Sequence, residues 1–398
     1  MDGPAVEGAE AHRTFMARAL ALAERGLGLA APNPMVGAVV VADGAVVGEG
    51  WHEGPGTPHA EVLALRAAGP RARGATLYVT LEPCTHHGRT PPCAPLVASS
   101  GVAEVVVATR DPNPVVDGAG LRFLREVGLR VVEGVLEQEA RELTLAFAKH
   151  VRTGLPFVVL KLAASLDGRT AARDGSSQWI TGEAARREVH RLRAASGAVV
   201  VGAGTVAADD PALTVRLDGY RGRQPLRVVV DGRGRTPPEA RVFDGAAPTL
   251  VATTQAAPPA ARAAWERAGA EVLVLEDPGA EGRVSLPALV EALGKRDVQG
   301  VLLEGGPTLA WSAVRAGVVD RLVLYLAPKL IGGTGAPGVL GGEGVGSLSH
   351  ALPVSLVEVA PVGEDLRVVA DLRPGPFRGE RQGDRADVAA VGGVHGDR

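Results

Sequence analysis

The segments TPHAE at residues 57–61 and EPCTHHGRTPPC at residues 82–93 bring His59, Cys84 and Cys93 into a region of alternating helices and strands. His59, Cys84 and Cys93 supply the three protein ligands of an open tetrahedral zinc site, in which the fourth position is left for water. Glu61 lies two residues after the histidine and is free to move protons. The two segments therefore predict a catalytic zinc site on a layered α/β domain.

The residues around these segments predict the elements that carry the site. A first helix is expected at residues 11–25, followed by a hairpin whose turn is Asp43-Gly44, a dipeptide that favours positive φ. Further helices are expected at residues 59–68, 93–100, 121–127 and 137–151, and strands at 76–81, 102–109 and 129–133. His59 and Cys93 each begin a helix, and the positive helix end favours neutral imidazole and thiolate, the forms that bind zinc.

A second α/β domain is expected after Gly154-Leu155-Pro156. Buried strands are expected at residues 157–163, 198–201, 226–230, 250–253, 271–275, 301–303 and 322–326, mostly separated by helical patterns. Glycine-rich strand ends at 201–205 and 304–308 are typical of backbone that approaches a phosphate, although a tight turn explains either one equally well. We expect domains at residues 11–154 and 155–373, a disordered amino terminus at 1–10 and a disordered tail at 374–398.

The bulk composition restricts the classes of function. The 398 residues are 46% hydrophobic and 22% charged, with a formal net charge of −3. Such a charge disfavours a dedicated nucleic-acid binder, and no secretory signal or membrane-spanning segment is visible. A cytoplasmic protein is therefore expected, in which Cys84 and Cys93 stay reduced. A Cys84–Cys93 disulfide and a closed structural zinc site completed by His86 or His87 are the alternatives to catalytic zinc.

Three motifs of the first half resemble one enzyme family. Residues 33–37 (NPMVG), 59–61 (HAE) and 82–93 resemble the bifunctional riboflavin-biosynthesis deaminase–reductase family, in which the long cysteine spacing replaces the C-x-x-C of other zinc deaminases. The resemblance covers residues 12–372 and implies a cytidine-deaminase-like three-layer α/β/α domain. It implies that His59, Cys84 and Cys93 hold one zinc ion and that Glu61 carries the proton. It also implies pocket roles for Asn33, Asp111 and Asn113.

The second half resembles the reductase half of the same family, which is similar in fold to dihydrofolate reductase. The resemblance rests on residues 161–169, 177–181 and 208–216. It implies NADPH contacts from Ala163, Trp179, Thr205, Asp209, Gly305, Gly306, Pro307 and Thr308, and substrate contacts from Ser177, Arg193, Leu213, Arg216 and Glu304. Arginine suits a phosphate because its guanidinium is a rigid charged fork, but Arg193 and Arg216 are also read as ordinary solvated arginines.

One segment departs from the family pattern. Residues 231–235 read DGRGR, with glycine where relatives can carry a serine near the cofactor. We hypothesise that Arg233 or Arg235 binds the 2′-phosphate of NADPH instead.

The resemblance implies a two-step enzyme. The first domain would deaminate 2,5-diamino-6-ribosylamino-4(3H)-pyrimidinone 5′-phosphate by hydrolysis, and the second would reduce the ribosyl group to ribityl with NADPH. A zinc deaminase of nucleosides or tRNA with an unrelated second domain, and a zinc-stabilised binding protein without chemistry, are the alternatives. A small phosphorylated pyrimidine is the expected partner, with no nucleic acid or membrane, and assembly into homo-oligomers is expected from the base rate of such assemblies.

Overall fold

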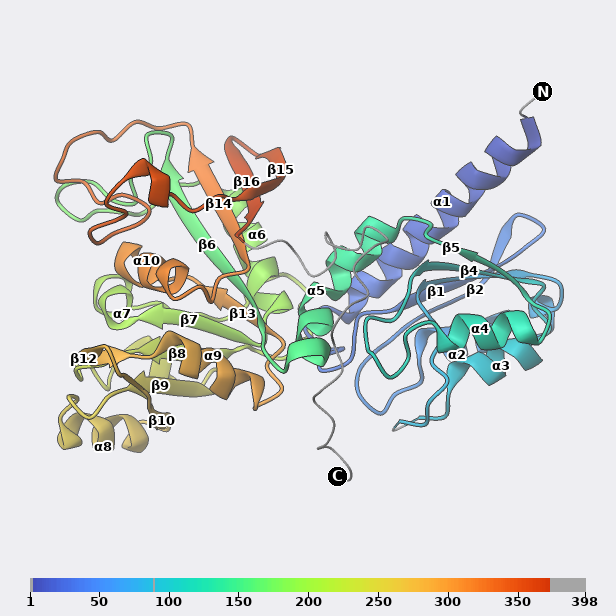
Figure 1. The fold of residues 1–398 in the computed structure, drawn as a ribbon, viewed down its shortest axis with the longest axis horizontal. Coiled ribbons are helices and arrows are strands. Elements are labelled where there is room, and N and C mark those ends of the chain that lie inside the picture. Colours follow the sequence, from blue (N-terminus) through green and yellow to red (C-terminus); the bar gives the residue numbers. More distant parts are fainter. Residues whose placement is uncertain (1–2, 89, 373–398) are drawn as a thin grey trace.

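Figure 1 shows the fold as a computed structural model, which describes residues 3–88 and 90–372. The chain forms two α/β units, each built on its own sheet, with the amino-terminal unit on the right of the view. Both expected sheets are therefore present. Among the described residues, none of the helices combines the length and apolar character that crossing a bilayer requires. The expected tail at 374–398 lies outside the described residues.

The first sheet has five strands in the order β2-β1-β3-β4-β5. Its strands are β1 Gly37–Ala42, β2 Ala45–Trp51, β3 Thr76–Leu81, β4 Glu104–Thr109 and β5 Arg130–Glu133. Strands β3, β4 and β5 run parallel, whereas β1 is antiparallel to both of its neighbours. The turn between β1 and β2 has positive φ at Asp43 and Gly44, as the dipeptide predicted.

Helices cover both faces of this sheet, which gives the expected three-layer arrangement. They are α1 Gly3–Ala23, α2 Ala60–Ala68, α3 Cys93–Ser99, α4 Ala119–Glu126 and α5 Glu137–Thr153. Helices α2, α3 and α4 share one core with the sheet, while α1 and α5 share another on the opposite face. Glycines in β1 and β2 let the helices α1 and α2 approach the sheet closely. A Cβ at Gly37 of β1 would lie 2.0 Å from the Ala19 carbonyl oxygen of α1, and a Cβ at Gly48 of β2 would lie 2.2 Å from the Ala64 carbonyl oxygen of α2.

The amino terminus differs from the prediction. The first helix was expected at residues 11–25, but α1 spans Gly3–Ala23 and so begins earlier. Ala5, Glu7, Ala9 and Glu10 have high helix propensity, Pro4 stands in the first turn where proline is tolerated, and adding turns to an existing helix costs little.

The second sheet has nine strands in the order β10-β9-β8-β7-β13-β6-β14-β16-β15. The strands from β10 to β14 in this order are parallel to their neighbours, and β16 and β15 close one edge as an antiparallel hairpin. The strands are β6 Phe157–Ser165, β7 Ala198–Gly202, β8 Leu226–Val230, β9 Thr249–Thr253, β10 Glu271–Val274, β13 Gly300–Leu303, β14 Arg321–Ala327, β15 Ser355–Val362 and β16 Asp365–Asp371. A separate hairpin joins β11 Glu276–Asp277 to β12 Ala280–Val284.

Helices again lie on both faces of the larger sheet. They are α6 Glu183–Ala195, α7 Ala203–Asp209, α8 Pro259–Arg267, α9 Leu286–Gly294 and α10 Pro307–Arg315. Alternate residues along each strand enter two separate cores: Val158, Leu160 and Leu162 of β6 pack with α9 and α10, whereas Val199 and Val201 of β7 pack toward Trp265 of α8. Such two-sided burial explains the nearly continuous apolar runs of the sequence.

Helix α5 connects the two units. It packs against β4 of the first sheet and against β6 of the second. Lys149 of α5 forms an ion pair of 2.5 Å with Asp320, at the start of β14, and both side chains are largely buried. Arg321 in turn binds Glu142 of α5. The junction is therefore a packed interface between the two sheets.

Candidate active site

The predicted zinc ligands meet at one edge of the first sheet. His59 caps the amino end of α2, Cys93 is the first residue of α3, and Cys84 follows β3. His59 Nδ1 lies 3.6 Å from Cys84 Sγ and 3.2 Å from Cys93 Sγ, and the ligand atoms all lie within 4.8 Å of one another. Neighbouring ligand atoms of a tetrahedral zinc site lie about 3.5 Å apart for bonds of 2.0–2.3 Å, so this donor set fits zinc.

The protonation of the cluster also suits a metal. The pKa of the Cys84 thiol is lowered to about 4, first by its hydrogen bond with Cys93 and also by His59. The pKa of Cys93 is raised, because it shares its proton with the Cys84 thiolate. His59 Nε2 lies 3.2 Å from Thr90 Oγ1, which leaves Nδ1 facing the sulfurs. The lowered pKa of Cys84 favours the thiolate, which is the form that binds zinc.

The two alternatives for the cysteines are not supported. Both cysteines are free thiols, so no disulfide joins them. His86 and His87 are exposed, and the potential metal-ligand group found among the described residues comprises only His59, Cys84 and Cys93. A closed site completed by either histidine therefore finds no support in the geometry.

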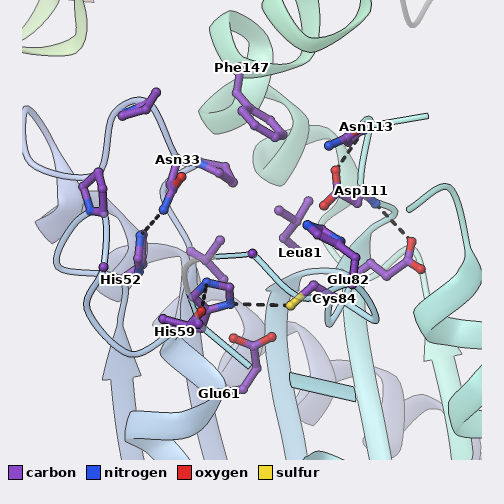
Figure 2. Close-up of a pocket in the computed structure, with 18 residues that line it drawn as sticks. Asn33, His52, His59, Glu61, Leu81, Glu82, Cys84, Asp111, Asn113 and Phe147 are labelled. Atoms are coloured by element: carbon purple, nitrogen blue, oxygen red, sulfur yellow. Dashed lines mark hydrogen bonds between the residues drawn. The ribbon is translucent and has the colours of Figure 1, made fainter. Parts of the chain in front are cut away.

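Glu61 lies beside the cluster in a buried position. Its side chain is 3% exposed, and burial raises the pKa of the carboxyl to about 7. Figure 2 shows Glu61 beneath His59, at the opposite side of the pocket from Phe147. A carboxyl group with a pKa near neutrality can both accept and release a proton at the working pH.

The pocket above this cluster contains the other residues expected in the first domain. It has a volume of about 310 Å³, and Asn33, Asp111 and Asn113 line it together with His59, Glu61 and Cys84. Asp111 lies just beyond β4, and its Oδ1 accepts a hydrogen bond of 2.8 Å from the backbone N–H of Asn113. Burial raises the pKa of Asp111 to about 6. The carboxyl ends of the parallel strands β3 and β4 thus place the cysteine loop and the Asp111 loop at the same edge.

Glu82 fixes these two loops relative to each other. Its carboxylate is buried and accepts hydrogen bonds from the amides of Asp111 (3.2 Å), Gly118 (3.0 Å) and Gly120 (2.7 Å). A Cβ at Gly120 would lie 2.0 Å from the Pro83 carbonyl oxygen, so the start of α4 touches the cysteine loop. The glutamate of the EPC segment is therefore a structural anchor.

Among the pocket residues that the sequence did not single out are His52 and Phe147. His52 is buried and lies between Asn33 and His59: its Nε2 is 2.9 Å from Asn33 Nδ2, and its ring is 5.3 Å from that of His59. Burial lowers the pKa of His52, so the neutral ring accepts from Asn33. Phe147 comes from α5 and closes the opposite wall (Figure 2). Neither residue belongs to a local motif, and only the fold brings them to the site.

In the second domain, several of the expected residues meet at the carboxyl edge of the larger sheet. Arg193 of α6 forms two hydrogen bonds with Glu304, of 2.6 Å and 2.9 Å, and donates a third to the Thr214 carbonyl at 3.0 Å. Arg193 is therefore a largely buried guanidinium in an ion pair, and reading it as a solvated arginine was wrong, because its partner Glu304 lies far away in sequence. Arg216, in contrast, is exposed beside His190, to which its amide donates.

Acidic and basic side chains offset each other's charge around Glu304, in a largely buried part of the second domain. Burial would raise the pKa of Glu304, but the charge and hydrogen bonds of Arg193 lower it below its ordinary value. Burial lowers the pKa of Lys161, which interacts with Glu304, Arg193 and Asp209. Burial raises the pKa of Asp209. Lys161 lies in one of the recognised segments but was not assigned a role from the sequence.

The turn before α10 joins the same region. Gly306 N donates to Thr205 Oγ1 at 3.2 Å, and Pro307 begins α10 at the edge of the sheet. Leu213 is buried with φ 54°. Trp179 is 64% exposed, in the segment before α6, and stacks on Arg186 at 4.7 Å. Ala163 of β6 packs against the core cluster that contains Ala185 and Val189 of α6, and Ser177 lies half-buried in the segment before that helix.

The DGRGR segment forms a tight turn after β8. The Asp231 carboxylate accepts from the amides of Arg233, Gly234 and Arg235. A Cβ at Gly232 would lie 2.2 Å from the Gly282 carbonyl oxygen of the β11–β12 hairpin, so a serine does not fit at position 232. Arg233 and Arg235 are exposed on this turn.

Comparison with known families assigns each half of the chain. Residues 9–109 match the cytidine and deoxycytidylate deaminase zinc-binding region, and residues 156–368 match the RibD C-terminal domain. The riboflavin biosynthesis protein RibD of Escherichia coli strain K12 is 46% identical over 363 residues, which cover 88% of this chain and 97% of that protein. The protein of the same name from Bacillus amyloliquefaciens is 44% identical and covers 89% of this chain and 95% of its own.

Solved structures show the same relationship over the whole fold. Acinetobacter baumannii RibD superposes with a TM-score of 0.79 at 40% identity, covering 91% of this chain and 99% of that one. A diaminohydroxyphosphoribosylaminopyrimidine deaminase/5-amino-6-(5-phosphoribosylamino)uracil reductase from Thermotoga maritima superposes with a TM-score of 0.79 at 39% identity, covering 92% and 99%. The expected fold class is confirmed in both halves.

Proposed function

Because this chain belongs to the RibD family, it catalyses two steps of riboflavin biosynthesis, and we propose which of its residues carry each step. The first step is the zinc-dependent hydrolytic deamination of the diaminopyrimidinone ribosylamino phosphate, and the second is the NADPH-dependent reduction of its ribosyl group to ribityl. We assign deamination to residues 11–154 and reduction to residues 155–373. The family matches at 9–109 and 156–368 support this division.

For deamination, the zinc ligands are His59, Cys84 and Cys93. A zinc ion held by three protein ligands supplies Lewis-acid activation of a water molecule. Glu61 accepts a proton at its carboxylate and releases it to the departing amine, and its buried position in the pocket beside His59 and Cys84 supports this role. Asn33, Asp111 and Asn113 bind the pyrimidine from the pocket wall. The position of Glu61 beside the ligand cluster is the observation that carries this assignment.

For reduction, NADPH supplies a hydride to the ribosyl carbon. We assign NADPH contacts to Ala163, Trp179, Thr205, Asp209 and the turn Gly305-Gly306-Pro307-Thr308, and substrate contacts to Ser177, Arg193, Leu213, Arg216 and Glu304. Within this set, the exposed Arg216 is the arginine that meets the phosphate directly, because the guanidinium nitrogens of Arg193 already donate to Glu304 and Thr214. Arg193 holds Glu304 and contacts the substrate through its remaining N–H groups.

In this proposal, Arg233 or Arg235 selects NADPH over NADH by binding the 2′-phosphate. Both are exposed on a turn after β8 whose backbone is fixed by Asp231, and arginine provides a charged fork for a 2′-phosphate. The ratio of activities with NADPH and NADH, measured in the Arg233→Ala/Arg235→Ala variant, tests the assignment. A ratio equal to that of the wild type would reject it.

We propose that the enzyme is a cytoplasmic homo-oligomer. The zinc-binding role of the free thiols of Cys84 and Cys93 supports a reducing compartment. Strand β15 supports self-association, because it is the edge of the larger sheet and exposes Leu356 (63%) and Val359 (54%). Light scattering of the wild type and of a Leu356→Lys variant tests it, and a wild-type monomer would reject it.

One incubation tests the two-step function. The pyrimidine substrate is added to zinc-loaded enzyme, ammonia is followed first, and NADPH absorbance is followed next. We expect ammonia release that a chelator abolishes, then oxidation of NADPH that depends on the deaminated product. Ammonia release without later NADPH oxidation would reject the second step.

A further inference from the structure

A residue of the reductase domain contacts a wall of the deaminase pocket. Gln299 Nε2 donates a hydrogen bond of 2.5 Å to the carbonyl oxygen of Pro32, which lines that pocket. Gln299 is 9% exposed and lies just before β13 of the larger sheet. Its own carbonyl accepts from Phe157 N at 2.7 Å, at the start of β6. The side chain therefore reaches out of the rigid second sheet to hold a loop of the first domain.

The loop that Gln299 holds carries a predicted substrate contact. Asn33 follows Pro32 directly, and its Nδ2 lies 2.9 Å from His52 Nε2. His52 in turn lies against the ring of His59. One wall of the pocket therefore runs from Pro32 through Asn33 and His52 to the metal ligand His59. Figure 2 shows Asn33, His52 and His59 along this wall. A displacement at Pro32 would be transmitted to the Asn33 amide.

The other walls of the pocket are also held at the junction between the domains. Phe147 lies on α5, and Lys149 of the same helix pairs with Asp320 at the start of β14. Asp320 also accepts from Val158 N of β6 at 2.7 Å. Arg152 Nε donates to the Pro112 carbonyl at 3.0 Å, between Asp111 and Asn113. Gln299 differs from these anchors, because it is the only one of the three donors whose own side chain comes from the reductase domain.

We propose that Gln299 is a positioning residue for deamination. This inference rests on the proposed deaminase function of the first domain. Loss of the Gln299 amide donor would leave the Pro32 carbonyl without its hydrogen-bond partner and would let the loop move. We expect this loss to weaken binding of the pyrimidine substrate about threefold to tenfold. Because the loop contacts the substrate away from Glu61, the loss falls on KM for deamination, and kcat changes little.

Two variants and one control test this role. Gln299→Met keeps the length of the side chain but removes the donor, and Gln299→Glu keeps the shape but turns an oxygen toward the carbonyl. Gln255→Met is the matched control, because Gln255 is an exposed residue of the same domain that binds Arg262. Each protein is assayed for kcat and KM of ammonia release, for bound zinc, and for reduction of separately supplied deaminated substrate.

We expect KM for deamination to rise about threefold to tenfold in Gln299→Met and further in Gln299→Glu, with zinc content, reduction and the control unchanged. An unchanged KM in both variants would overturn the proposal. A parallel loss of reduction would also overturn it, because Gln299 would then only maintain the fold of its own domain. Absence of ammonia release from the wild type would instead reject the proposed function.

Discussion

Replacing Glu61 by glutamine should stabilise the metal-free protein while removing deamination. Burial raises the pKa of this carboxyl from 4.5 to about 7, and each pKa unit corresponds to about 1.4 kcal/mol. Because the pKa is higher in the folded state, the free energy of unfolding keeps its full contribution from the protonated Glu61 below pH 4.5. That contribution is lost as the pH rises through 7. Ionised Glu61 therefore costs the fold about 3 kcal/mol above pH 7, and the neutral glutamine avoids that cost.

The assay compares wild type and Glu61→Gln by urea unfolding of the first domain after zinc has been removed from both, because a bound dication would favour the carboxylate. We expect the variant to be more stable by about 3 kcal/mol near pH 8 and equally stable near pH 4. In zinc-loaded protein, ammonia release should fall by about 10²- to 10⁴-fold at unchanged zinc content. A stability difference that does not depend on pH, or a variant that retains deamination, would refute the reasoning.

Three other substitutions probe the pocket, the junction and the reductase site. Phe147→Ala should raise KM for deamination about threefold to tenfold without changing zinc content or reduction, and an unchanged KM would show that the ring does not contact the substrate. Lys149→Met should lower the free energy of unfolding by about 3 kcal/mol, because Asp320 loses its buried partner, and adding Asp320→Asn should restore most of it in urea denaturation. Glu304→Gln should weaken the buried pair with Arg193 and abolish NADPH oxidation while ammonia release continues; equal loss of both activities would contradict this role.

The strands that are buried on both faces are the elements that the sequence predicted most reliably. Strand β3 has the predicted bounds, Thr76–Leu81, because a continuous apolar run between turn residues has few alternative structures. Strands β15 and β16 were not predicted. The outer strand β15 is largely exposed on both faces, so neither a buried run nor a clean alternation marks it. Their pairing depends on β14, to which β16 adds antiparallel.

The residues of the deaminase site also fall into a predictable group and a group that the sequence does not reveal. His59, Glu61, Cys84 and Cys93 lie within two short segments, where spacing alone carries chemical information. His52, Phe147 and Gln299 reach the deaminase pocket through tertiary contacts, which no local pattern encodes. Arg193 shows the same limit, because its environment is decided by Glu304, a residue on another strand end, and composition favours an exposed arginine.

Helix α5, packed on both sheets, determines how the two halves of the chain can be exchanged. A hybrid joined at residues 154–156 to the second half of a relative would place Lys149 opposite whichever residue the relative has at position 320, and Pro32 opposite its residue at position 299. We expect a hybrid to keep the junction where the relative has an acidic residue at position 320 and a hydrogen-bond donor at position 299. Exchanging the second half therefore also exchanges the partners of Lys149 and Pro32, and with them part of the support of the deaminase pocket.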